Sequence, residues 1–132
     1  MTLENKIVLF ICIGNSGRSQ IAEAFLNNFS KKFTAVSAGT EPDKNIHPRT
    51  IKLMEEIGID VSKRKPKLLN LKMLEKSDKI IILDSELLNN IPKKYLVKTE
   101  LWKIEKLPGK SMREVKKIRN QIEKKVKQLI RA

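Results

Sequence analysis

The stretch Asn5-Lys-Ile-Val-Leu-Phe-Ile-Cys-Ile-Gly-Asn-Ser-Gly-Arg-Ser-Gln20 decides how this chain folds. It begins with an apolar run at residues 7–11. A run that is short and rich in β-branched residues predicts a strand covered on both faces. A helical pattern follows directly, with apolar residues at Ile21, Ala22, Phe25, Leu26 and Phe29. Cys12, the only cysteine of the 132 residues, therefore lies between a predicted strand and a predicted helix.

The loop after Cys12 has the composition of an anion-binding loop. Gly14 and Gly17 let backbone N–H groups turn inward, and the start of the helix adds a partial positive charge. Arg18 supplies a planar fork that can hold two oxygens of a phosphate. Because the same field stabilises a thiolate, Cys12 is predicted to attack a phosphoryl-type centre as a nucleophile. The alternative is a buried cysteine that acts only as a small hydrophobic residue.

Length and composition indicate one globular domain over residues 1–132, with a single core. No apolar run approaches the length of a membrane span and the N-terminus does not resemble a signal peptide, so we expect no membrane association. One cysteine cannot form an intrachain disulfide. A free reactive thiol suits a reducing compartment, which predicts a cytoplasmic location.

The chain is strongly basic, with a formal net charge of +13. Residues 110–132 contain nine lysines and arginines against Glu114 and Glu123. We interpret this excess as the solvated face of a helix, with steering of anionic substrates as a second interpretation. Nucleic-acid binding is disfavoured, because no aromatic residue follows Trp102 and the basic stretch has no stacking platform.

The rest of the chain alternates predicted strands with predicted helices. Strands are expected at residues 33–37, 79–83 and 95–101. Helices are expected to begin at Pro48, near Leu71, after Asp84 and after the capping box Ser111-Met-Arg-Glu114. A basic cluster at residues 63–67 is interpreted as solvated or as a border of the site. The only histidine, His47, precedes Pro48 and is expected to be structural.

This alternation predicts an α/β fold: a single-domain, three-layer α/β/α arrangement around a four-stranded parallel sheet. Ligands of such sheets bind at the carboxyl ends of the strands. Cys12, Gly39, Asp84 and residues 102–108 all follow predicted strands. We therefore expect them to meet at one edge of the sheet.

The motif Cys12-Ile-Gly-Asn-Ser-Gly-Arg18-Ser19 resembles the active-site loop of the low-molecular-weight protein tyrosine phosphatase superfamily, which includes thioredoxin-coupled arsenate reductases. The resemblance implies that Cys12 and Arg18 are catalytic and that a phospho-cysteine forms, without a metal or an organic cofactor. It also implies that Ser19 hydrogen-bonds the thiolate and that the Asn15 side chain pins the loop. The implied oxyanion-binding residues are Ile13, Gly14, Asn15, Ser16, Gly17 and Ser19.

The sequence departs from this superfamily at the general acid. Relatives carry an Asp-Pro pair in the region of residues 102–108, whereas here Lys106 takes the place of the aspartate and the proline is displaced to Pro108. Glu105 is the nearest carboxylate and is a candidate acid if the loop turns or shifts by one residue. Asp84 resembles the phosphatase branch, which has an aspartate at the end of the corresponding strand. The reductase branch instead has a cysteine in this region and another a few residues on, and this chain has neither.

These observations predict a cysteine-dependent phosphomonoester hydrolase that resembles low-molecular-weight protein tyrosine phosphatases. One alternative is an arsenate reductase-like protein that uses an external small thiol or redoxin, since a single cysteine cannot relay a disulfide. Another is a non-catalytic oxyanion binder. The expected partner is a phosphorylated protein, a small phosphate or arsenate. The sequence leaves the choice among them open, as it does the oligomeric state.

Overall fold

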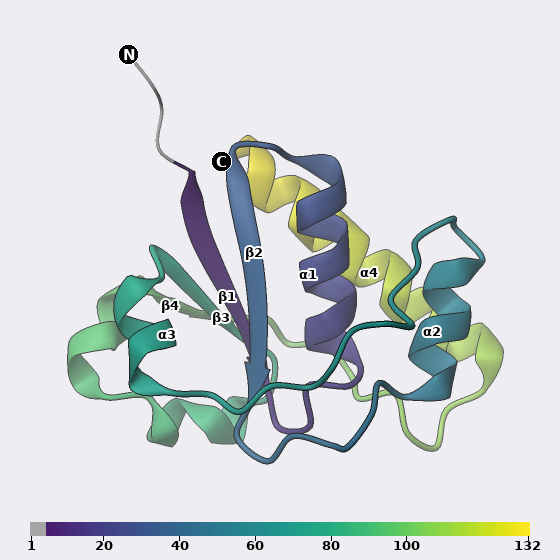
Figure 1. The fold of residues 1–132 in the computed structure, drawn as a ribbon, viewed down its shortest axis with the longest axis horizontal. Coiled ribbons are helices and arrows are strands. Elements are labelled where there is room, and N and C mark those ends of the chain that lie inside the picture. Colours follow the sequence, from purple (N-terminus) through teal and green to yellow (C-terminus); the bar gives the residue numbers. More distant parts are fainter. Residues whose placement is uncertain (1–4) are drawn as a thin grey trace.

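The structure, a computed structural model, describes residues 5–132. Its centre is a four-stranded sheet in the order β2-β1-β3-β4, and all three strand pairs are parallel (Figure 1). The strands are β1 (Lys6–Cys12), β2 (Phe33–Gly39), β3 (Lys79–Ile82) and β4 (Thr99–Leu101). The predicted α/β fold with a four-stranded parallel sheet is therefore confirmed.

Helices cover both faces of the sheet, which confirms the three-layer prediction (Figure 1). One face carries α1 (Arg18–Phe29), α2 (Pro48–Glu55) and α4 (Met112–Arg131). The other face carries α3 (Leu71–Lys76) and two 3₁₀ helices, η1 (Ser85–Asn90) and η2 (Lys93–Lys98). No helix of residues 5–132 is both long and apolar enough to cross a membrane.

The alternation of side chains along β1 builds the two halves of the core. Val8 and Phe10 face α1 and α4, whereas Leu9 and Ile11 face α3 and the 3₁₀ helices. All four side chains are fully buried, as a central parallel strand requires. Because Cys12 continues the Val8 and Phe10 series, its side chain points toward the α1 side of the sheet.

The last helix forms as its sequence predicts. The Ser111 hydroxyl accepts a hydrogen bond from the Glu114 N–H at 3.2 Å, and the Glu114 carboxylate accepts one from the Ser111 N–H at 3.0 Å. Hydrogen bonding of the Glu114 carboxyl by the Ser111 N–H, and then by the Ser111 hydroxyl, lowers its pKa. Five apolar residues of this helix pack into the core and leave several of its lysines exposed: Val115, Ile118, Ile122, Val126 and Leu129.

Two predictions about the face of the sheet that carries α3 and the 3₁₀ helices are wrong. Residues 93–98 form a 3₁₀ helix, not the first part of a strand, so β4 is only three residues long. The Tyr95 N–H donates to the Pro92 carbonyl at 2.9 Å, and Val97, which a strand would bury with Tyr95, is 93% exposed. Asp84 precedes η1 but makes no side-chain cap, because its carboxylate is engaged elsewhere.

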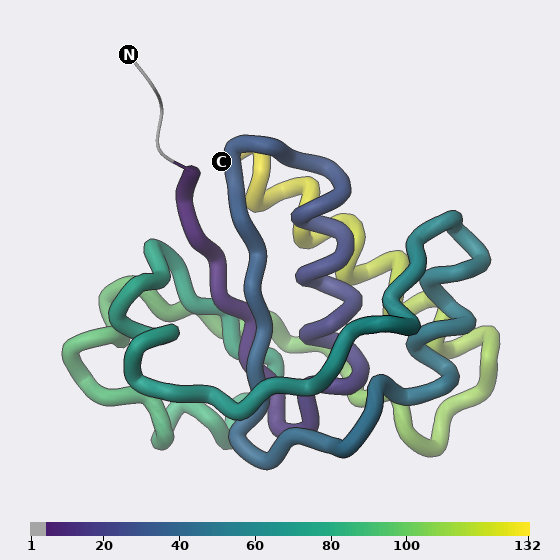
Figure 2. Tube along the Cα trace, in the orientation of Figure 1, coloured from purple at the N-terminus to yellow at the C-terminus, as the bar shows by residue number. Residues whose placement is uncertain are grey.

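The carboxyl end of β2 lies between residues 67–69 and the loop after β1. The Gly39 N–H donates to the Lys67 carbonyl at 2.8 Å, and the Leu69 N–H donates to the Gly39 carbonyl at 2.9 Å. Residues 67–69 thus run beside the end of β2, as the trace in Figure 2 shows. A Cβ atom at Gly39 would lie only 2.5 Å from the Ile13 carbonyl oxygen and 3.1 Å from the Asn15 nitrogen.

This close approach predicts that Gly39→Ala destabilises the protein. The added methyl group meets backbone, which cannot swing away, so the free energy of unfolding should fall by about 1–3 kcal/mol. The control is Gly58→Ala, where a Cβ has open space but φ is +81°. Its cost should be about 1 kcal/mol from the left-handed backbone alone. Urea unfolding of both variants checks this, and an equal cost would mean that the contact at Gly39 relaxes freely.

Candidate active site

The thiol of Cys12 lies at the floor of a loop formed by residues 13–17, between the end of β1 and the start of α1. Its sulfur accepts a hydrogen bond from the Asn15 N–H at 3.1 Å and lies 2.8 Å from the Ser19 hydroxyl oxygen. The residue is buried, and α1 starts at Arg18 with its N-terminus directed at the loop. One backbone donor, a hydroxyl group and a helix terminus therefore surround the sulfur atom.

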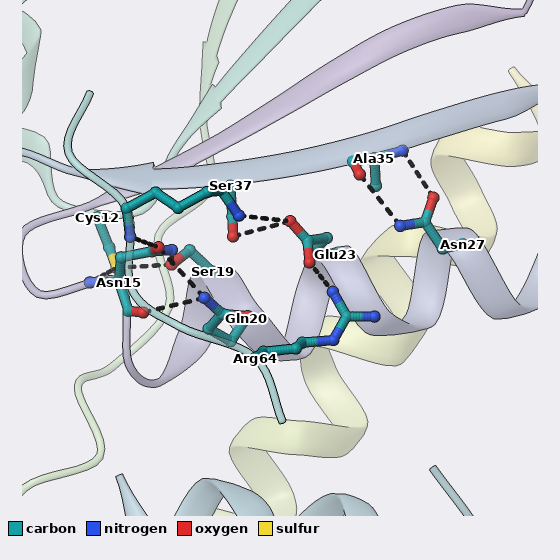
Figure 3. A network of polar contacts seen from close by, with 10 residues as sticks. Cys12, Asn15, Ser19, Gln20, Glu23, Asn27, Ala35, Ser37 and Arg64 are labelled. Atoms are coloured by element: carbon teal, nitrogen blue, oxygen red, sulfur yellow. Dashed lines mark hydrogen bonds and ion pairs between the residues drawn. The ribbon is translucent and has the colours of Figure 1, made fainter. Parts of the chain in front are cut away.

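Asn15 holds the loop in shape. It is the only non-glycine among residues 5–132 with a positive φ, at 51°, and it is fully buried. Its Nδ2 donates to the Ser19 hydroxyl at 2.8 Å, and its Oδ1 accepts from the Lys67 N–H at 2.9 Å (Figure 3). Gln20 Nε2 adds bonds to the Asn15 carbonyl oxygen at 3.1 Å and to Oδ1 at 3.2 Å. These bonds offset the cost of the left-handed backbone.

A buried carboxylate extends this network along α1. Glu23 accepts a hydrogen bond from the Ser37 hydroxyl at 3.0 Å and forms an ion pair with Arg64 (Figure 3). The Lys67 ammonium lies 3.7 Å from the same carboxylate. Burial lowers the pKa of Arg64. The pKa of Lys67 is lowered mainly by burial and, to a smaller extent, by the positive charge of Arg64.

The basic cluster at residues 63–67 is therefore not simply solvated, because two of its cations face Glu23. The sequence contained a signal that Glu23 has a cationic partner, although it did not identify which residue that is. Glu23 follows Ser19 by one helical turn on the face that carries Ala22 and Leu26, and a carboxylate on a buried face requires a cationic partner.

Arg18 and Asp84 form a buried ion pair beside the loop. Arg18 Nη2 lies 2.5 Å from Asp84 Oδ1, and Arg18 Nη1 donates to the carbonyls of Leu83 at 2.6 Å and Ile104 at 2.7 Å. The other oxygen of Asp84 accepts the Ile13 N–H at 3.1 Å. Of the five N–H donors of a guanidinium, these contacts use three and leave two for a ligand.

A pocket of about 340 Å³ lies above the Cys12 loop. Residues 12–18 line it together with Asp84, so the predicted meeting of strand ends is confirmed for β1 and β3. The segment after β4 contributes Lys106, Leu107 and Pro108. Gly39 does not line this pocket but supports the loop from behind.

The connection between β2 and α2 adds three pocket residues that the sequence interpretation missed: Glu41, Asp43 and His47. The Asp43 N–H donates to the Gly14 carbonyl at 2.9 Å, and its carboxylate accepts the Ser16 hydroxyl. His47 Nδ1 accepts the Arg49 N–H at 3.0 Å and caps α2, which agrees with its predicted structural role. Their position after the carboxyl end of a predicted strand was the available signal.

The structure does not bring Glu105 into the Cys12 pocket. Glu105 lines a second cavity, of about 510 Å³, which shares Arg18, Asp84 and Lys106 with the first. Residues 102–106 carry no regular secondary structure, and Trp102 and Ile104 are buried while Lys103 and Glu105 are exposed, as in an extended segment. The loop therefore does not make the shift that the Glu105 hypothesis required. Lys106 is the charged residue of this segment that lines the Cys12 pocket.

No group of three histidine, cysteine, aspartate or glutamate side chains within the described part of the chain is arranged to hold a metal ion. The groups available for chemistry in the pocket are one thiol, one arginine, one lysine, the His47 imidazole, the loop N–H groups and the carboxylates of Glu41, Asp43 and Asp84.

Comparisons with known proteins agree with this geometry. Arsenate reductase 2 of Staphylococcus saprophyticus subsp. saprophyticus is 35% identical over 128 residues, which cover 96% of this chain and 97% of that protein. A solved structure described as an arsenate reductase in the phosphate binding state is 32% identical and superposes with a TM-score of 0.81, covering 95% of this chain and 96% of its own.

The fold is also that of a low molecular weight protein tyrosine phosphatase from T. tengcongensis, with a TM-score of 0.87, 24% identity, and coverage of 96% of this chain and 99% of that one. The sequence profile of the family described as low molecular weight phosphotyrosine protein phosphatase matches residues 7–132. The resemblance seen in the Cys12 motif is thereby confirmed, and the chain belongs to the low molecular weight phosphotyrosine protein phosphatase family.

Proposed function

We propose that this member of an enzyme family is a phosphomonoester hydrolase that uses Cys12 as its nucleophile. The observation that carries the proposal is the Cys12 sulfur itself. It accepts the Asn15 N–H at 3.1 Å and lies 2.8 Å from the Ser19 hydroxyl, at the floor of a pocket that Arg18 also lines. Donors that stabilise a thiolate and donors that bind an oxyanion are thus combined in one loop.

In the proposed reaction, the Cys12 thiolate attacks phosphorus and forms an S–P bond while the bond from phosphorus to the leaving oxygen breaks. Arg18 and the N–H groups of Gly14, Ser16 and Gly17 hold the other phosphoryl oxygens as their charge is redistributed, because the N–H groups of Ile13 and Asn15 are engaged by Asp84 and by the Cys12 sulfur. Water then cleaves the phospho-cysteine and releases phosphate and the free thiolate. The reaction requires no reductant, metal or organic cofactor.

The substrate is proposed to be a small phosphate or a phosphorylated protein whose leaving group departs readily. Protonation of a poor leaving group by a carboxylic acid is typically worth about 10²–10⁴ in rate. Lys106, and not a carboxylic acid, lines the pocket from the segment after β4. We therefore propose fast hydrolysis of activated aryl phosphates and slow hydrolysis of phosphotyrosine. Because a free thiol suits a reducing compartment, we still predict a cytoplasmic location.

Arsenate reduction is the second candidate, favoured by the relatives named arsenate reductase. Arsenate has the shape and charge of phosphate and would enter the same loop. Its reduction to arsenite needs two electrons, which two thiols supply when they form a disulfide. Since the chain has one cysteine, the second thiol has to come from an external small thiol or a redoxin.

Cys12→Ser tests the nucleophile. We expect the variant to lose hydrolysis of 4-nitrophenyl phosphate while it still binds inorganic phosphate, because the loop donors and Arg18 remain. Turnover and phosphate titration by calorimetry measure the two properties separately. Full turnover in the serine variant would refute the proposal, and a wild-type protein that binds phosphate without turnover would indicate a non-catalytic oxyanion binder.

Arg18→Lys tests the forked contact. Lysine retains the charge but cannot donate two parallel bonds to phosphate, nor hold Asp84 and two carbonyls together. The rate of aryl phosphate hydrolysis should fall by about 10² or more, similar to the loss of a major transition-state donor. Circular dichroism and thermal unfolding control for misfolding. A folded variant with a near-normal rate would show that the fork does not contact the phosphoryl group.

Arsenate with and without an external thiol tests the second candidate. Arsenate and thioredoxin without another thiol should give no sustained arsenite, because one cysteine cannot form an intrachain disulfide. If the candidate is correct, adding glutathione as the external thiol should restore turnover, and phosphate should inhibit it. Arsenite would be quantified by chromatography with Cys12→Ser as the control. Robust multiple turnover with thioredoxin alone would show that the redoxin itself supplies the second thiol, and would contradict the expected need for a small thiol.

A further inference from the structure

We infer that Glu23, which does not line the pocket above Cys12, is a positioning residue for the Cys12 thiolate. It anchors residues 64–67, and the Lys67 N–H in turn fixes the direction in which the Ser19 hydroxyl donates its hydrogen. The inference rests on the proposed role of Cys12 as the nucleophile and deepens it, because it adds a control of the thiolate from outside the loop. The side chains of Glu23, Ser19 and Cys12 lie along one network in Figure 3.

The direction of the hydrogen bond between Ser19 and Cys12 follows from the second partner of the hydroxyl. The Ser19 oxygen and the Cys12 sulfur lie 2.8 Å apart, and either atom could be the donor. Asn15 Nδ2 also lies 2.8 Å from the Ser19 oxygen, and an amide nitrogen can only donate. Ser19 is fully buried, and its hydroxyl has no third partner among residues 5–132. Its single hydrogen therefore points at the sulfur, where it stabilises a thiolate.

The orientation of the Asn15 amide is set from outside the loop. Its Oδ1 atom accepts the Lys67 N–H at 2.9 Å, and a backbone N–H can only donate. Gln20 Nε2 supports the same orientation at 3.2 Å, but a glutamine amide can itself rotate, and Gln20 Oε1 has no hydrogen-bond partner within the described chain. If the Lys67 N–H withdrew, a flipped Asn15 amide would present its oxygen to Ser19. The hydroxyl hydrogen would then turn away from the sulfur.

Glu23 holds the segment that carries this N–H. Its side chain is 5% exposed, pairs with Arg64 and lies 3.7 Å from the Lys67 ammonium. The Ser37 hydroxyl donates to the same carboxylate at 3.0 Å, which ties α1 to β2. The Gly39 N–H donates to the Lys67 carbonyl at 2.8 Å, so β2 holds the peptide unit after Lys67. The ion pairs with Glu23 are therefore what holds the stretch before it, which includes the Lys67 N–H.

The charge of Glu23 alone predicts the opposite effect from this relay. Removing a negative charge near the loop would favour a second anion at Cys12. If Glu23 acts through the Ser19 hydroxyl, its removal instead withdraws a hydrogen bond from the thiolate and disfavours the anion. A carboxylate that only stabilised the fold would leave the ionisation of Cys12 unchanged. The sign of the effect therefore separates the three roles.

The experiment measures the pH dependence of Cys12 alkylation by iodoacetamide in the full chain. Since the chain has one cysteine, the adduct found by mass spectrometry reports one thiol and needs no turnover. Ser19→Ala removes the donor and should raise the midpoint pH by about 1–2 pH units, the typical contribution of a hydrogen bond to a charged group. Glu23→Gln should raise it by about 0.5–1 pH unit, because Gln20 still supports the Asn15 amide. Both variants retain the titratable groups that line the pocket with Cys12: Arg18, Glu41, Asp43, His47, Asp84 and Lys106.

A double-mutant cycle tests the route of the effect. In the Ser19→Ala background, Glu23→Gln should cause no further rise, since the hydroxyl through which it acts is absent. The matched control is Glu56→Gln, which removes another carboxylate paired with a lysine and an arginine, at 3.3 Å from Lys116 and 3.7 Å from Arg119. This control should leave the midpoint pH unchanged. Thermal unfolding shows whether each variant is folded.

A rise in Glu23→Gln that disappears in the Ser19→Ala background supports the inference. A fall, no shift, or a rise that persists without the Ser19 hydroxyl would overturn it. Where Glu23→Gln does not fold, Arg64→Gln takes its place in the cycle, because a through-space effect of the lost cation would persist in that background. The proposed function is judged separately: a wild type that shows these shifts but does not hydrolyse 4-nitrophenyl phosphate would refute the hydrolase and leave the relay intact.

Discussion

The buried contact between Arg18 and Asp84 ties together the parts of the chain that form the site. Arg18 opens α1, Asp84 follows β3, and the same guanidinium binds the Ile104 carbonyl in the segment after β4. Through its second oxygen, Asp84 also holds the Ile13 N–H. Two charges removed from water are tolerable only when each is paired and hydrogen-bonded, and loss of one partner typically costs about 3–5 kcal/mol. The pair therefore fixes the loop, β3 and the pocket wall relative to one another.

Much of this arrangement could be predicted from local patterns. The apolar run before Cys12, the glycines of the loop and the capping box at Ser111 each specify their structure within a few residues. What the sequence did not reveal depends on distant partners. Asp84 was expected to cap a helix, but Arg18 lies 66 residues away along the chain and takes its carboxylate. Arg64 and Glu23 are separated by 41 residues, and no local rule pairs them.

The segment around Tyr95 shows a different kind of error, in which local composition predicted the wrong backbone conformation. Residues 95–101 have the composition of a strand, yet the N–H of Tyr95 closes a 3₁₀ turn on Pro92 and only residues 99–101 pair with β3. Proline before the segment favours such a turn, and the buried Tyr95 ring still reaches the core from it. The apolar pattern therefore located the contact with the core correctly but not the backbone that makes it.

The loop around Cys12 binds a tetrahedral oxyanion without specifying what happens to it, because phosphate and arsenate present the same oxygens to the same donors. The outcome depends on groups outside the loop. A second thiol would direct the chemistry toward reduction, and a carboxylic acid would extend hydrolysis to poor leaving groups. This chain offers no second thiol, and residues 102–108 bring Lys106 into the pocket while Glu105 faces the second cavity. An ammonium at that place stabilises an anion that leaves, but it is a weaker proton donor than the carboxylic acid that a poor leaving group requires. The positive charge of Lys106 therefore restricts which leaving groups the site can accept, although the Cys12 loop itself binds either oxyanion.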